Sequence, residues 1–267
     1  MKKLVILAVL LSLMTTSFSV QAHREALLKS ANVAANGAYT RKAFLELNKQ
    51  AFDVQDSRRK LLIIGDSHAQ DFLNAVNENN YLTHYQIRTH YIPTRCQVVF
   101  EAQARTHIEA KDRAFCQQAN ELDLAKPIVA EADVIILVAR WRDWSAKLLP
   151  STLQQLAVKP QQKVIVLGTK DFGKVNVRQY LSSTLKELVK LTNKVDPVPI
   201  ATNDPLSQGA KHYTFVNQQS IICGSTTTCR LFTEQGELIS YDGGHLTPAG
   251  AKWVGQRLFT NSPLGQL

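Results

Sequence analysis

A short stretch at residues 61–69, Leu-Leu-Ile-Ile-Gly-Asp-Ser-His-Ala, decides the class of fold. Its four consecutive apolar residues are typical of a strand that is buried on both faces of a parallel sheet. The segment that follows, from Ala69 to Asn79, places Phe72, Leu73 and Val76 on one face of a helix. A buried strand that leads directly into an amphipathic helix is the first half of a β-α-β unit.

Four further apolar runs repeat this pattern along the chain, and helix-like stretches separate them. Such an alternation is the signature of a parallel sheet that is covered by helices. We therefore expect an α/β fold, a three-layer α/β/α sandwich around a mainly parallel five-stranded sheet. The other runs lie in the region from His84 to Ile92 and at Val134–Val138, Val164–Leu167 and Tyr213–Val216.

Two longer stretches complete the expected order of elements. Residues from His23 to Lys60 are typical of a helix followed by an extended segment, and residues from Gln179 to Leu191 predict a further helix. No linker rich in Gly, Ser or Pro and no internal repeat divides the chain. We expect one domain over residues 23–267, which is long enough to bury a full core.

The first 22 residues have the three-part layout of a secretory signal peptide. Lys2 and Lys3 precede an apolar run from Leu4 to Leu13, and a polar stretch ends at Ala22. That apolar run is too short to cross a hydrocarbon core, which needs about 20 apolar residues. We expect cleavage after Ala22 and a soluble bacterial protein that is periplasmic or secreted.

The charge of the chain leaves two interpretations open. The chain has 31 Lys and Arg against 22 Asp and Glu, and two of the lysines lie in the predicted signal peptide, so the rest carries a formal charge of +7. This excess could favour acidic glycans or an anionic membrane surface, or it could be a generic basic surface, because the charges are dispersed. Export and the lack of an aromatic-basic motif speak against a nucleic-acid partner.

All 4 cysteines lie in the part that we expect to be exported, where disulfides persist. Three pairings are possible. We favour Cys96 with Cys116 and Cys223 with Cys229, because each pair closes a short polar loop. A zinc site is disfavoured, since the chain has no C-x-x-C spacing.

In open parallel sheets, ligands bind outside the carboxyl ends of the strands. Three segments follow apolar runs in this way, at residues 65–68, 140–143 and 168–171, and residues 241–250 follow the last run. In the last segment, Thr247 and Pro248 are a good N-cap and first residue for a helix. His245 is therefore expected on a loop just ahead of a C-terminal helix.

Ser67 lies two residues past a buried strand and at the start of a helix, where its hydroxyl would be exposed and backbone N–H groups would point at its target. Taken alone, it could equally be a helix N-cap. Asp242 and His245 favour a nucleophile over an N-cap at Ser67, because their spacing lets the carboxylate hold one imidazole nitrogen while the other nitrogen faces a nucleophile. We expect Ser67, His245 and Asp242 to form a catalytic triad, and His68, which should point away, to have a substrate or structural role.

These motifs resemble those of the SGNH superfamily, also called GDSL-type hydrolases. Gly65-Asp66-Ser67 resembles the first motif, with the nucleophile at Ser67, and Asp242-Gly243-Gly244-His245 resembles the last, with the catalytic acid and base. GDSHA at residues 65–69, Ala139-Arg140-Trp141 and residues 242–250 are most similar to the SGNH domains fused to membrane acyltransferases that O-acetylate bacterial surface sugars. The resemblance implies a flavodoxin-like sandwich.

The oxyanion hole departs from the superfamily pattern. Neither the glycine of the second motif nor the asparagine of the third is legible, and Arg140-Trp141-Arg142-Asp143 stands in the place of the third. Either Arg140 or a backbone N–H replaces the asparagine, or the oxyanion hole is weaker than usual. Alternatively, Arg140 and Trp141 only cap the sheet and fill a groove. The candidate oxyanion or substrate contacts are the Ser67 backbone N–H, His68, Arg140 and Trp141.

The resemblance implies an exported serine esterase or acyltransferase that acts on O-acyl groups, above all O-acetyl, of an envelope or exported polysaccharide. It would need no cofactor and no metal, and it could associate with envelope polysaccharide-modifying machinery. One alternative is a non-catalytic glycan-binding or polysaccharide-assembly protein on the same fold. A metallophosphoesterase is disfavoured, because it needs further Asp, Asn and His ligands at strand ends and the chain lacks a G-N-H-[DE] motif.

Overall fold

The computed structural model describes residues 21–22, 24–104, 106–119 and 122–267. Residues 1–20 of the predicted signal peptide lie outside the described residues, so its cleavage stays a prediction. Within the described part, no helix combines the length and the apolar character that crossing a membrane requires.

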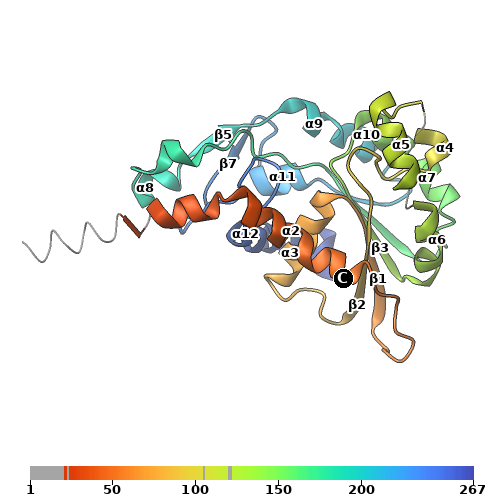
Figure 1. Ribbon diagram of the computed structural model, residues 1–267. Helices are drawn as coiled ribbons and strands as arrows, with labels where there is room; N and C mark the ends of the chain where they lie inside the picture. Colours follow the sequence, from red (N-terminus) through yellow and green to blue (C-terminus); the bar gives the residue numbers. More distant parts are fainter. Residues whose placement is uncertain (1–20, 23, 105, 120–121) are drawn as a thin grey trace, which may run out of the picture.

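The main sheet has five parallel strands in the order β2-β1-β3-β4-β6. Counted along the sheet's own strands, this is the flavodoxin-like order 2-1-3-4-5. Each predicted apolar run overlaps one of these strands, with differences of one residue at the ends of β2 and β6, which confirms the expected sheet (Figure 1). The strands are β1 (Arg59–Gly65), β2 (Tyr85–Tyr91), β3 (Val134–Val138), β4 (Lys163–Leu167) and β6 (Thr214–Val216).

Helices cover both faces of this sheet. Successive strand residues point to opposite sides, and the apolar side chains on both sides are buried under helices. Leu61 and Ile63 belong to one core and Leu62 and Ile64 to the other, and all four are fully buried. The predicted three-layer sandwich is therefore confirmed (Figure 1). The first face is covered by α2 (Val33–Leu47), α3 (Ser67–Asn77), α11 (Gln218–Cys223) and α12 (Pro248–Thr260), and the second by α4 (Glu101–Ala104), α5 (Ala110–Gln118), α6 (Leu122–Glu131), α7 (Asp143–Gln155) and α10 (Asn203–Gln208). Two further short helices are α9 (Pro197–Ala201) and η2 (Pro263–Gln266).

An extension beyond the sandwich has a small core of its own. The strands β5 (Thr192–Lys194) and β7 (Thr228–Arg230) pair antiparallel in a second sheet. The side chains of this third core come from segments distant in sequence: Leu27, Val177, Leu188, Leu231, Phe232 and Leu238.

The predicted helix from Gln179 to Leu191 is wrong, because two short elements replace it. These are η1 (Val177–Tyr180) and α8 (Leu185–Leu188). Thr184 lies between them and begins α8 with a capping box, in which its backbone N–H donates to Glu187 Oε2 at 2.7 Å. Ser and Thr side chains compete for backbone hydrogen bonds and favour helix starts over helix interiors, so this polar segment interrupts the apolar periodicity.

Both predicted disulfides are present. Cys96 bonds Cys116 and Cys223 bonds Cys229, with Cα–Cα separations of 5.3 Å and 4.7 Å. The first joins the loop after β2 to α5, and the second joins the end of α11 to β7. Both therefore fasten segments that leave the main sheet.

Candidate active site

The turn after β1 depends on a glycine and a buried carboxylate. Gly65 has a φ of 154°, and a Cβ there would lie 1.7 Å from the carbonyl oxygen of Val138, so only glycine lets β3 approach. Asp66 caps α3 by accepting from the His68 N–H at 2.9 Å, and it also accepts from the Arg140 N–H at 3.0 Å. Burial raises the pKa of Asp66, while these two bonds work against that effect. Asp66 thus fastens the turn to the end of β3.

Ser67 is the first residue of α3, and its side chain is only partly buried. At this position the unpaired N–H groups and the dipole of the helix favour negative charge near the hydroxyl. The Ser67 Oγ lies 2.7 Å from His245 Nε2, within hydrogen-bond reach. The structure therefore brings together residues 178 positions apart.

The loop that carries His245 is held in a tight turn. Gly243 has a φ of 98°, and a Cβ there would lie 2.1 Å from the carbonyl oxygen of Gly173, so the loop needs glycine at this point. Asp242 Oδ1 accepts from the N–H groups of Gly244 at 2.9 Å and His245 at 2.8 Å. After the loop, Thr247 caps α12 and Pro248 is its first residue, as the sequence predicts.

The second oxygen of Asp242 completes a continuous hydrogen-bonded chain. Asp242 Oδ2 lies 2.7 Å from His245 Nδ1. With the proton on Nδ1, Nε2 is free to accept the proton of the Ser67 hydroxyl, which is the arrangement that activates a serine. The three residues that the sequence singled out as a triad therefore lie in the geometry expected of one.

Mutual hydrogen bonding shifts the pKa values of both Asp242 and His245. Burial opposes ionisation of Asp242, but the bonds from His245 hold its pKa at about 2. Burial likewise disfavours a charged His245, yet Asp242 and the nearby Asp71 carboxylate raise the pKa of His245 above its ordinary value. Asp242 is therefore ionised across the range in which His245 titrates, as a residue that stabilises an imidazolium must be.

Arg140 and Trp141, the predicted oxyanion or substrate contacts, are placed differently by the structure. The Trp141 side chain is buried, and its Nε1 donates to the Leu167 carbonyl at 2.9 Å, so it joins β3 to β4. Arg140 is exposed, and its backbone is fixed by Asp66 and by Gln97 Nε2, which donates to the Arg140 carbonyl at 3.1 Å. This geometry favours the groove-filling interpretation for Trp141 and leaves Arg140 as the side chain that faces open space.

His68 lies beside the triad but not in it. The residue is 2% exposed, and the ring centroids of His68 and His245 are 5.9 Å apart. Among the described residues, His68 Nδ1 has no hydrogen-bond partner. Burial, with the positive charges of Lys170 and Arg140 nearby, lowers the pKa of His68 well below its usual value. The ring is therefore neutral, and its burial favours the structural role over direct contact with a substrate.

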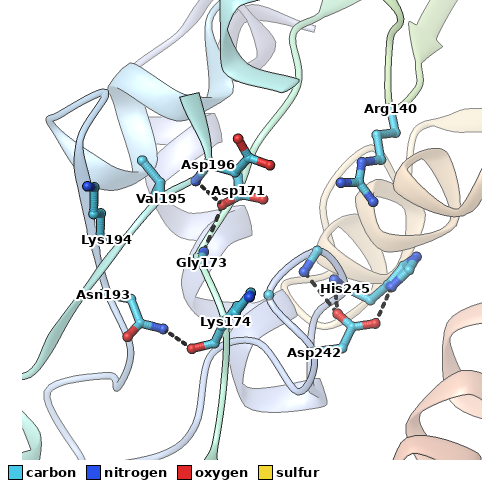
Figure 2. A pocket seen from close by; sticks show the side chains of 12 residues that line it. Arg140, Asp171, Gly173, Lys174, Asn193, Lys194, Val195, Asp196, Asp242 and His245 are labelled. Carbon is cyan, nitrogen blue, oxygen red and sulfur yellow. Dashed lines mark hydrogen bonds and ion pairs between the residues drawn. The ribbon is translucent and has the colours of Figure 1, made fainter. Parts of the chain in front are cut away.

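A cavity opens beside the Asp242–His245 loop, with a volume of about 590 Å³. Figure 2 shows the Arg140 side chain above the Asp242–His245 loop, pointing toward it. A second cavity of about 420 Å³ shares Arg140 and Asp196 with the first, so the two cavities adjoin each other. The first cavity is lined by Arg140, Asp171, Gly173, Lys174, Asn193, Lys194, Val195, Asp196, Asp242, Gly243, Gly244 and His245.

Two functional candidates escaped the sequence interpretation. Asp71 and Lys170 form a buried ion pair, with Lys170 Nζ 2.8 Å from Asp71 Oδ2, and both contact the loop that carries His245. A signal for each is present in the sequence. Asp71 is four residues after Ser67 and so shares its helix face, and Lys170 lies in the segment after β4. A carboxylate on a helix face that packs on a sheet requires a buried partner.

The arrangement around His245 also bears on metal binding. Both ring nitrogens of His245 are used, one by Asp242 and one by Ser67, so a metal ion would have to displace one of these bonds. Over the described ranges of the chain, no group of three or more His, Cys, Asp or Glu side chains is arranged to hold a metal ion.

A family model described as the SGNH domain that is fused to AT3 domains matches residues 38–259. No curated protein matches the chain.

Several solved structures are similar to the chain at low identity. One is a mutant of Axe2, an acetyl-xylooligosaccharide esterase from Geobacillus, with 12% identity, a TM-score of 0.39 and coverage of 76% of this chain and 93% of that chain. Another is the C-terminal catalytic domain of the peptidoglycan O-acetyltransferase OatA of Streptococcus pneumoniae, with 14% identity, a TM-score of 0.37 and coverage of 76% and 92%. A third is a possible lipase from Chitinophaga pinensis, with 11% identity, a TM-score of 0.38 and coverage of 74% and 95%.

Proposed function

Because the chain belongs to the family of SGNH domains fused to AT3 domains, we propose that it is a serine enzyme that hydrolyses or transfers O-acyl groups of a carbohydrate. The single observation that carries this proposal is the unbroken chain of hydrogen bonds from Ser67 Oγ through the His245 ring to Asp242. The first acyl group to consider is acetyl, since the motifs at both ends resemble domains associated with sugar O-acetylation.

In the first half of the reaction, Ser67 Oγ attacks the acyl carbonyl carbon as His245 Nε2 takes the hydroxyl proton. Asp242 holds the Nδ1 proton and stabilises the imidazolium. The tetrahedral intermediate then expels the sugar oxygen, which receives the proton from Nε2, and an acyl-serine remains. In the second half, His245 deprotonates water or a second sugar hydroxyl, which attacks the acyl-serine. The second tetrahedral intermediate expels Ser67 Oγ, which receives the proton from His245 Nε2, and the acid or the new ester is released.

Charge on the carbonyl oxygen must be stabilised as each tetrahedral intermediate forms. We assign this role to the Ser67 N–H at the start of α3 and to the guanidinium of Arg140, which lines the same cavity as His245. Arg140 replaces the asparagine that is missing from the third motif. Its side chain is exposed, so it would move into place when an acyl group occupies the site.

The substrate that fits best is an acylated polysaccharide outside the cytoplasm. Two disulfides are compatible with an oxidising compartment, and the first 22 residues have the pattern of a signal peptide. The cavity beside His245 is lined largely by polar and charged residues and is open enough to accept a sugar unit. The protein would then act beside envelope polysaccharide-modifying machinery.

The test uses the mature protein, a fluorophosphonate probe and a small acetyl ester. The probe should label the wild type on Ser67, and Ser67→Ala should lose both labelling and ester hydrolysis while its melting temperature stays close to that of the wild type. Ser57→Ala, which changes an exposed serine in a loop, is the matched control and should behave as the wild type. Full labelling or hydrolysis by Ser67→Ala would disprove the serine mechanism.

The non-catalytic alternative gives a different result in the same assays. A folded wild type that reacts with neither the probe nor the ester, but that binds acetylated glycans, would indicate a glycan-binding or assembly protein.

A further inference from the structure

The ion pair between Asp71 and Lys170 is the most completely buried pair of opposite charges in the described part of the chain. Lys170 Nζ lies 2.8 Å from Asp71 Oδ2, and the side chains are 2% and 0% exposed. Removing two charges from water is costly, and their mutual attraction alone seldom compensates for it. A buried pair of this kind therefore needs further hydrogen bonds to both partners.

Each partner makes its second bond to the loop that carries His245. Lys170 Nζ donates to the carbonyl oxygen of Gly244 at 2.7 Å, and Asp71 Oδ1 accepts from the N–H of Leu246 at 3.2 Å. Gly244 and Leu246 are the residues immediately before and after His245. The pair thus holds the backbone on both sides of the proposed base, although neither side chain enters the triad.

The origin of the two side chains adds to this effect. Asp71 is on α3, one helical turn after Ser67, so a single rigid helix carries the nucleophile and one anchor of the His245 loop. Lys170 follows β4 and ties the loop to the sheet. The position of His245 relative to Ser67 is therefore determined by α3 and by the end of β4.

We propose that Asp71 and Lys170 are positioning residues, which keep His245 aligned with Ser67 and balance the charge beside its ring. The inference rests on the proposed function for its catalytic meaning. Its structural content, the control of the His245 ring by a buried pair, can be measured without any catalysis.

The two charges act on the His245 ring in opposite directions. The Asp71 carboxylate raises the pKa of His245, and the Lys170 ammonium lowers it. Asp242 also raises it through a direct hydrogen bond. The other titratable or charged side chains around the ring and its cavity are Arg41, Asp66, His68, Arg140, Asp171, Lys174, Lys194, Asp196 and Tyr241.

The experiment compares Asp71→Asn, Lys170→Met and the double variant with the wild type. The pKa of His245 is followed by NMR of its ring in each folded protein, with His245→Gln used to assign the signal among the 7 histidines. Asp71→Asn leaves an ammonium without its carboxylate and should lower that pKa, whereas Lys170→Met should raise it. The double variant should return it close to the wild-type value.

Enzyme kinetics supply the second readout. We expect kcat to fall by about 10- to 100-fold in the single variants with little change in KM, because displacing a catalytic group by a fraction of an ångström affects the chemical step. The acid limb of the pH profile should move with the pKa of His245. In the double variant the pKa should recover while kcat stays low, since the bond to the Gly244 carbonyl is still lost.

Lys60→Met is the matched control, because it breaks an ion pair of 2.9 Å with Glu131 at the opposite end of β1. It should change neither the His245 pKa nor kcat. If the single variants do not fold, the double variant, which has no unpaired buried charge, provides the test through its kcat.

The outcomes separate this inference from the proposed function. Single variants that leave the pKa of His245 unchanged or shift it in the same direction would overturn the inference, as would a double variant with wild-type kcat. An inactive wild type in which the single variants shift the pKa in opposite directions would overturn the proposed function, while the control of His245 by the pair would stand.

Discussion

The two sides of Ser67 are built in contrasting ways. On the side of the proposed base, Asp242 fixes the His245 ring, and the buried pair of Asp71 and Lys170 fixes the backbone around it. On the side of the proposed oxyanion hole, the backbone of Arg140 is fixed, but its guanidinium makes no hydrogen bond or ion pair with the rest of the described chain. The proposed proton-transfer groups are thus in place before a substrate arrives, whereas the proposed charge stabilisation depends on an exposed side chain that no bond holds in position.

This difference has an energetic consequence. Fixed donors stabilise a developing charge at no cost at the moment of reaction, but a flexible arginine must first lose side-chain entropy, roughly 2 kcal/mol at most. A site of this kind favours substrates that draw the arginine into place by contacts of their own. Changes on the two sides should therefore have effects of different size.

The largest effect is expected on the base side. His245→Ala should reduce the rate of ester hydrolysis on the order of 10⁴-fold or more, because base and nucleophile act as a unit. Asp242→Asn should retain somewhat more activity, since it keeps the shape of the loop and loses only the charge. Steady-state kinetics on a small acetyl ester provide the measurement, with the exposed His212→Ala as the control. A His245→Ala protein with a tenth of wild-type activity would contradict the triad.

A smaller effect is expected on the oxyanion side. Arg140→Ala should lower kcat by about 10²-fold, the loss typical of one oxyanion donor, with the fold intact because the anchoring bonds are made by the backbone. Arg140→Lys should recover part of this loss by restoring the charge without the planar fork. If Arg140→Ala changes kcat by less than threefold, the backbone alone stabilises the oxyanion, and the contrast between the two sides disappears.

The pH dependence of the wild type sharpens the comparison further. The pKa of His245 is raised, so kcat/KM should fall about tenfold per pH unit below an acid limb that lies above pH 6.5. The contribution of this residue to stability depends on pH in the opposite direction. The ion pair with His245 protonated is fully present below the unfolded pKa of His and is lost as the pH rises through the folded value.

Asp242 sets the lower boundary of that stability window. Its pKa is about 2, so its contribution holds above the unfolded value near 4 and is lost as the pH falls toward 2. Thermal melts of the wild type and Asp242→Asn should differ most near pH 5, where hydrolysis is slow. A difference that instead grows above pH 8 would contradict this assignment.

The smallest effect on rate is expected from the disulfides. Replacing both cysteines of the Cys96–Cys116 pair by serine should lower the unfolding free energy by about 3 kcal/mol, and replacing the Cys223–Cys229 pair should lower it by about 2 kcal/mol, because the second loop is shorter. Cys96 adjoins Gln97, which holds the Arg140 carbonyl, so the first change should also slow hydrolysis a few-fold. Denaturant titration measures the unfolding free energies, and steady-state kinetics measure the rates. Equal rates of hydrolysis in both double variants would show that the Cys96–Cys116 disulfide does not influence Arg140.

The sheet and the two end motifs are legible in the sequence for physical reasons. Strands buried on both faces must be continuously apolar, as Leu61 to Ile64 are, and residues after such strands must meet at one edge. The glycines at positions 65 and 243 mark backbone positions where a side chain would collide with a carbonyl oxygen. These features leave local signals, and they were sufficient to place Ser67 and His245 together.

The features that the sequence concealed depend on contacts between distant segments. The apolar periodicity over residues 179–191 is real, but the third core uses it for two short elements, since Thr184 begins a new helix. Asp71 and Lys170 are 99 residues apart, so neither has a sequence neighbour that reveals its partner. Arg140 and Trp141 are adjacent in sequence, yet only packing decides that one is exposed and the other buried.

Ser67 and His245 are 178 residues apart, and from this separation we expect an order of events during folding. The sheet and α3 can form before the last segment of the chain arrives, whereas the His245 loop is fixed only when α12, which follows it directly, packs against α3. Contacts this distant in sequence form late, because the intervening loop must first be closed. The reactivity of Ser67 toward a fluorophosphonate during refolding then reports when the C-terminal helix docks. This reactivity should recover later than the helical circular dichroism.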